Sequence, residues 1–89
     1  MAPTDPTACS LYAEFTVEPF VPGQIGRHVQ AAIEAAIGQG AVVDVGPFGN
    51  AVHADTAEEV LASVIAALRA AIANGATRFS LQVDTAPIA

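Results

Sequence analysis

Two stretches of the chain carry polar side chains at every second position, and these side chains include an aromatic ring and two carboxylates. They are Ser10, Tyr12 and Glu14 in the first stretch, and Ser80, Gln82 and Asp84 in the second. Because successive side chains of a strand point to opposite faces, each stretch predicts one polar face. A ring beside carboxylates suits a cationic aromatic ligand, which can stack and form an ion pair, while amides and hydroxyls can bind its ring nitrogens.

The central segment adds further candidate binding residues. Two short strand-like runs, Val42–Val45 and Ala51–Ala54, flank a Gly-Pro-Phe-Gly turn, which predicts a β-hairpin. The candidates are Asp44, Phe48, Gly49, Asn50 and His53. Either Ala51 with His53 or Asn50 with Val52 shares the polar face, because a shift of one residue exchanges the two pairs. Protonation of His53 would make nearby cation binding depend on pH.

Catalytic and metal chemistry have little support in this sequence. It contains no nucleophile elbow, phosphate-binding loop or recognisable acid–base pair. The single cysteine, Cys9, is expected to be a small core side chain, and His28 a surface residue. We therefore expect no catalytic residues, no metal and no cofactor, and we expect a protein that is not an enzyme.

Composition restricts the partners that the chain can have. The 89 residues suffice for one small domain, with 53% apolar and only 13% charged residues. Such low charge in a small domain predicts that apolar surface is covered by a second copy, in a dimer or tetramer. The net charge is −6 and lysine is absent, which argues against binding nucleic acid or an anionic membrane. The default location is a reducing cytoplasm.

The elements expected from periodicity alternate in a way that defines the fold class. A strand at Cys9–Glu18 precedes a helix from near Pro22 or Gly23 to Ile37, and after the hairpin a second helix begins at Asp55-Thr56. Asn74-Gly75 ends that helix, and Arg78–Asp84 forms the last strand. This βαββαβ order predicts an α+β, ferredoxin-like domain over residues 9–85, with tails at 1–8 and 86–89. Two helices should cover one face of a four-stranded antiparallel sheet whose first and third strands are central.

Each expected helix carries an apolar stripe that should face the sheet. Charges along both helices argue against membrane spans. The first stripe is Ile25, Val29, Ala32/Ile33 and Ala36/Ile37, and the second is Val60/Leu61, Val64/Ile65, Leu68 and Ala71/Ile72.

Three segments resemble a known family. They are Cys-Ser-Leu-Tyr at Cys9–Tyr12, Gly-Pro-Phe-Gly at Gly46–Gly49, and Asn-Gly-Ala-Thr-Arg-Phe at Asn74–Phe79. In their order and spacing, over about Cys9–Asp84, they resemble the small thiamine-binding proteins, which comprise the tandem-domain YkoF proteins and their single-domain relatives. The resemblance implies a ferredoxin-like domain that assembles into dimers or tetramers through sheet faces. It also implies binding of thiamine or its hydroxymethylpyrimidine part, without an established reaction, in ligand transport or salvage.

Two interpretations of the polar face follow. In the first, it binds thiamine or a related pyrimidine at a subunit interface. In the second, the chain is a structural assembly module, and the same face is only the contact between subunits. A small-molecule enzyme is a third, weaker interpretation because the residues form no catalytic constellation.

Overall fold

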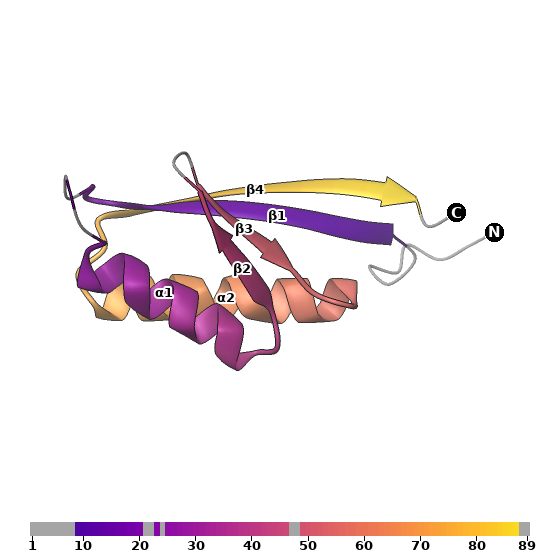
Figure 1. Cartoon of the computed structure of the whole chain (residues 1–89), viewed down its shortest axis with the longest axis horizontal. Coiled ribbons are helices and arrows are strands. Elements are labelled where there is room, and N and C mark those ends of the chain that lie inside the picture. Colours follow the sequence, from indigo (N-terminus) through magenta and orange to yellow (C-terminus); the bar gives the residue numbers. More distant parts are fainter. Residues whose placement is uncertain (1–8, 21–22, 24, 47–48, 88–89) are drawn as a thin grey trace.

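The computed structural model describes residues 9–20, 23, 25–46 and 49–87. Six elements follow one another in the order βαββαβ (Figure 1). Their bounds are β1 Cys9–Glu18, α1 Arg27–Gly38, β2 Val42–Val45, β3 Asn50–His53, α2 Ala57–Ala73 and β4 Arg78–Pro87. The expected tail at residues 1–8 and the central residues of the hairpin turn, Pro47 and Phe48, lie outside the described residues.

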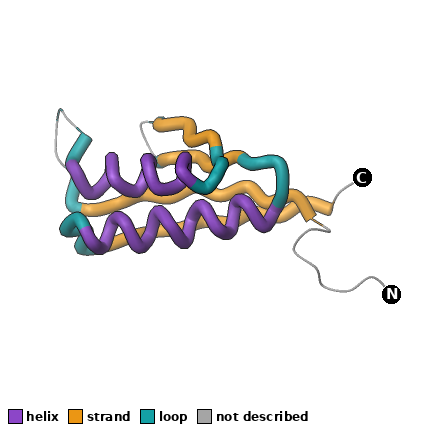
Figure 2. Tube along the Cα trace, turned by 90° about the horizontal axis from the view of Figure 1, so that it is seen from below, coloured by secondary structure: helices purple, strands orange, loops and turns teal. Residues whose placement is uncertain are grey.

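The four strands form one antiparallel sheet in the order β2-β3-β1-β4. Both helices lie side by side on the same face of this sheet (Figures 1 and 2). The prediction of an α+β, ferredoxin-like fold is therefore confirmed, with β1 and β3 central and β2 and β4 at the edges. No helix of the described chain is both long enough and apolar enough to span a bilayer.

The strands match the sequence pattern closely, with two differences. β1 has the predicted bounds, but β3 begins at Asn50, one residue before the predicted run. β4 continues to Pro87, three residues beyond the predicted end. The reason for the longer strand is its partner, because β4 pairs with β1 without interruption from Glu18↔Arg78 to Cys9↔Pro87. On the N-terminal side of Ala13, β1 has no pair with β3, so this end of β1 forms a two-stranded ribbon with β4.

The start of α1 and the position of His28 differ from the prediction. The helix begins at Arg27, and Pro22 lies outside the described residues. His28 is buried, with 7% of its surface exposed, and its Nε2 atom lies 2.6 Å from the Pro19 carbonyl oxygen. Its ring occupies the space that a side chain at Gly26 would need. A polar residue on a short helix thus satisfies a loop carbonyl instead of facing solvent.

α2 begins and ends as the sequence predicts. The Thr56 hydroxyl accepts a hydrogen bond from the Glu59 backbone N–H at 3.1 Å and donates one to the Glu59 carboxylate at 2.9 Å. Such an N-cap stabilises a helix by about 1 kcal/mol. At the other end Gly75 has a φ of 95°, the left-handed conformation that glycine adopts without strain. The capping residues therefore fix both ends of this helix.

The core between the helices and the sheet is built from small helix side chains and larger strand side chains. Phe15, Val17 and Val52 are fully buried, and the Phe15 ring stacks on Phe79 with centroids 5.1 Å apart. The fully buried alanines of the helices are Ala32, Ala36, Ala67 and Ala71. Alanine at these positions lets α1 and α2 approach each other closely.

The predicted apolar stripe of α2 is only partly correct. Its buried residues are Ala57, Val60, Ser63, Val64, Ala67 and Ala71. Ile65, Leu68 and Ile72, which the stripe includes, are exposed. On α1, Ile37 is exposed in the same way, and Ile25 precedes the helix. Alanine, serine and two valines, Val60 and Val64, fill the buried face of α2, so the aliphatic surface beside it has no partner within the described chain.

Candidate functional site

The face of the sheet that the helices leave uncovered carries the predicted polar row. Tyr12 is 54% exposed and Glu14 is exposed, whereas Ala13, Phe15 and Val17 between and beyond them are buried under the helices. Cross-strand pairs place Asp84 opposite Tyr12 and Gln82 opposite Glu14. Because directly paired residues share a face of the sheet, these four side chains lie together on the open face.

The register of β3 decides which of its residues joins them. Ala51 pairs with both Glu14 of β1 and Asp44 of β2, so Ala51 and His53 lie on the open face. Asn50 lies on the helix face with 6% of its surface exposed, and its Nδ2 donates to the Phe15 carbonyl oxygen at 3.2 Å. Of the two arrangements left open by the sequence, the one with Asn50 on the polar face is wrong. Asn50 contributes to folding at this position.

A shallow depression of about 160 Å³ lies in the open face. Its lining includes Tyr12, Glu14, Ala51, His53, Gln82 and Asp84. Three strands, β1, β3 and β4, therefore bring together five of the candidate side chains named from the sequence. The carboxylates of Glu14 and Asp84 give the depression a negative character, which favours a cation.

Ala51 explains why the face is hollow at this point. Its methyl group lies between Glu14 and Asp44, and its neighbours on the same face along the chain are Gly49 and His53. From the sequence, Ala51 is considered only as the residue that would share the polar face with His53. Two small residues at alternate positions, Gly49 and Ala51, are the signal that could have identified this part of the face as open.

Two local contacts hold side chains beside the depression. His53 Nε2 lies 3.1 Å from Asp44 Oδ2, which brings Asp44 to the edge of the site although it does not line it. The Glu14 side chain crosses Gly49 so closely that a β-carbon there would be 3.0 Å from Glu14 Cγ. Gly49 thus has a structural role in the site, since it leaves room for the Glu14 carboxylate.

The remaining candidates are placed elsewhere. Ser80 pairs with Thr16, and Ser10 pairs with Ala86, so both serines are on the open face but on opposite sides of the depression. Neither lines it. Phe48 lies outside the described residues. Within the described part of the chain, no group of three or more His, Cys, Asp or Glu residues is arranged to hold a metal ion.

Comparison with known proteins adds no family assignment. The chain matches no model of a known protein family, and no curated protein matches its sequence significantly.

Proposed function

We propose that the open face binds a small cationic aromatic molecule of the pyrimidine type, with thiamine or its hydroxymethylpyrimidine part as the first candidates. The observation that carries this proposal is the convergence of Tyr12, Glu14, His53, Gln82 and Asp84 on one depression. The identity of the ligand comes from the sequence resemblance to thiamine-binding proteins. The proposed role is binding, in transport or salvage of the ligand, without catalysis.

The side chains fit the chemistry of an aminopyrimidine. The Tyr12 ring offers a stacking surface, and its neighbours on β4 and β1 offer carboxylates for a positive charge. The Gln82 amide can donate and accept at once, as the edge of an aminopyrimidine requires. Charge-assisted hydrogen bonds to Glu14 would contribute more than neutral ones.

The size of the depression limits what it can enclose. Typical small-molecule sites have volumes of roughly 300–1,000 Å³, whereas this one has about 160 Å³. It therefore suits one ring, and the remainder of a two-ring ligand would extend over the open face. In the expected assembly through sheet faces, a second copy of the chain would supply further walls. We place this role in the cytoplasm, where a lone cysteine such as Cys9 stays reduced.

Calorimetry with thiamine and with hydroxymethylpyrimidine tests the proposal. We expect binding to the wild-type protein and an affinity about tenfold lower for Glu14→Gln, because the variant keeps the shape but loses the charge. Glu34→Gln is the matched control, since Glu34 is an exposed glutamate on α1 that bonds to Gln30, away from the open face. Absence of binding to the wild type, or equal affinities for Glu14→Gln and wild type, would contradict the proposal.

A further inference from the structure

β4 is an edge strand that is unusually available for pairing. It has ten residues, and its pairs with β1 continue along the whole strand without a bulge. Natural proteins protect edge strands by making them short or by adding bulges, prolines or lysines. The proline of β4 is its last residue, Pro87, and the chain has no lysine. The other edge strand, β2, has only four residues.

Exposed aliphatic side chains lie directly beside this edge. Leu81 and Val83 pair with Phe15 and Ala13, so they are on the helix face, yet both are exposed. α2 packs mainly on β1, the neighbour of β4, and also on β3, whereas α1 packs on β2 and β1. Leu81 and Val83 are thus at the margin of the helix layer, with no helix on their outer side in the described chain.

The adjacent flank of α2 is aliphatic as well. The aliphatic side chains of this flank are Leu61, Ile65, Leu68 and Ile72. They recur at spacings of four, three and four residues, so they form one stripe along the helix. At the C-terminal end of α2, the side that carries the C-cap residue Asn74 faces α1, because Arg27 Nε donates to Asn74 Oδ1 at 3.0 Å. The aliphatic stripe is on the other flank, toward β4. We call the combined surface the β4 flank, and it consists of Leu61, Ile65, Leu68, Ile72, Leu81 and Val83.

We propose that the β4 flank binds a second copy of this chain, with β4 pairing antiparallel to β4 of that copy. A two-fold axis normal to the sheet keeps both helix layers on one side. The two β1 strands would then be three strand spacings apart, about 14 Å. A helix with side chains is about 10–12 Å wide, so the two α2 helices would stand on either side of a narrow gap above the β4 strands, and Leu81 and Val83 of both copies would fill this gap.

Charge selects the register of this pairing. With the axis at Leu81, Arg78 of each copy stands opposite Asp84 of the other, which gives two ion pairs. An axis at Ser80 or Gln82 would place Arg78 opposite Gln82 or Ala86 instead. Opposite charges directly across a pair of strands stabilise it, and like charges destabilise it. The Leu81 register is therefore the favoured one among these three.

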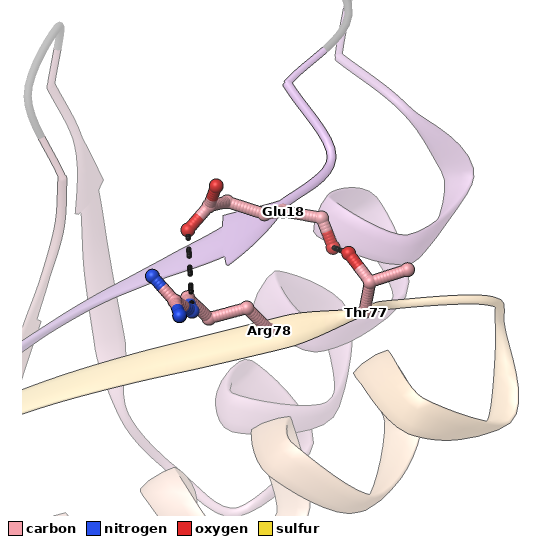
Figure 3. Close-up of polar contacts among 3 residues, drawn as sticks. All are labelled: Glu18, Thr77 and Arg78. Carbon is pink, nitrogen blue, oxygen red and sulfur yellow. Dashed lines mark hydrogen bonds and ion pairs between the residues drawn. The ribbon is translucent and has the colours of Figure 1, made fainter.

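The environment of Arg78 is compatible with this contact. Its Nε atom is 3.9 Å from the Glu18 carboxylate, and its side chain is 73% exposed (Figure 3). In the dimer Arg78 would lie between Glu18 of its own copy and Asp84 of the second copy. Since Asp84 lines the candidate site, the second copy would contribute an arginine to the edge of that site.

A second copy is the occupant that the surface itself favours. β4 carries Arg78 and Asp84 three residues on either side of Leu81, so the edge of this strand is complementary to itself under a two-fold rotation. An isologous contact of this kind closes the assembly at two copies and leaves no β4 edge open. The inference concerns the assembly of the chain, and it can be tested without any ligand.

Charge exchange tests both the dimer and its register. We expect sedimentation equilibrium to show a wild-type dimer at micromolar concentrations. Arg78→Asp and Asp84→Arg should each raise the dimer dissociation constant by roughly tenfold or more, because both ion pairs become like-charge pairs.

Mixing the two variants should restore association. In the mixed dimer the two substituted side chains face each other with opposite charges, and the unchanged Asp84 of one variant faces the unchanged Arg78 of the other. Native mass spectrometry of the mixture should show mainly the heterodimer, which also requires that both variants fold.

A pair of equally exposed isoleucines tests the helix part of the surface. Ile65 on α2 and Ile37 on α1 are both 52% exposed. Ile65→Gln should weaken the dimer several-fold, and Ile37→Gln should leave it unchanged. A wild-type protein that stays monomeric throughout the micromolar range would overturn the proposal. So would single charge variants that associate like the wild type, a mixture without preferred heterodimer, or equal effects of the two isoleucine variants.

Discussion

His53 Nε2 and Asp44 Oδ2 lie 3.1 Å apart on the open face of the sheet, although the residue paired with His53 in the backbone register is Val42. The contact is therefore diagonal across the β2–β3 hairpin. Both side chains are well exposed, at 52% for His53 and 72% for Asp44. The contact joins a residue that lines the depression to one that does not, and it orients the imidazole at the edge of the site.

Replacing Asp44 should affect binding more than folding. An exposed pair of this kind contributes at most about 1 kcal/mol to stability, so we expect Asp44→Asn to change the free energy of unfolding little in urea titrations. The Asp44→Asn variant loses a negative charge and the contact that orients His53. We therefore expect its thiamine affinity in calorimetry to be roughly threefold lower. Asp55→Asn, an exposed aspartate before α2, is the control. A large loss of stability with unchanged affinity would show that the pair is structural.

Gly49 should be required for the position of the Glu14 carboxylate. In Gly49→Ala the new methyl group would lie 3.0 Å from Glu14 Cγ, so the glutamate side chain must move. Because the carboxylate is displaced but not removed, we expect thiamine affinity to fall by less than in Glu14→Gln, by roughly threefold. Gly38→Ala is a suitable control, because a β-carbon at Gly38 meets no atom within 4 Å. Equal affinities of Gly49→Ala and wild type in calorimetry would show that binding does not depend on the space above Gly49.

Asn50 should matter for stability and not for the ligand. Its buried Nδ2 donates to the Phe15 carbonyl oxygen on the helix face. Asn50→Ala removes this bond and should lower the free energy of unfolding by about 1–3 kcal/mol. Under conditions where the variant is folded, its affinity for thiamine should equal that of the wild type. Lost affinity in a variant of normal stability would place Asn50 in the site instead.

His28 should stabilise the loop before α1 through its contact with the Pro19 carbonyl oxygen. His28→Phe retains a ring in the buried position but cannot form this hydrogen bond. Because the carbonyl would lose its partner, we expect the free energy of unfolding to fall by about 1–3 kcal/mol in urea titrations. Gln30→Ala, at an exposed position of the same helix, should have little effect. Equal stabilities of His28→Phe and wild type would mean that the ring acts by packing alone.

Much of the fold could be predicted because it depends on local periodicity. Strict alternation in Cys9–Glu18 indicated the bounds of β1 and its two faces, and Thr56 and Gly75 indicated the ends of α2. Alternation also separates Tyr12 and Glu14 from Phe15 and Val17, so the polar row on the open face is encoded in β1 itself. A period of two residues fixes which side chains share a face before any tertiary contact forms.

Only the tertiary structure decided the features that depend on contacts between distant segments. The register of β3 against β1 placed His53 outward and Asn50 inward, which a strand of four residues cannot specify alone. The position of α2 over β1 buried Ala67 and Ala71 and left Ile65 and Ile72 exposed. Hydrophobicity alone would favour burial of the two isoleucines over burial of the two alanines. Sequence periodicity defines the faces of each element, but the neighbour that covers a face is set by packing across the chain.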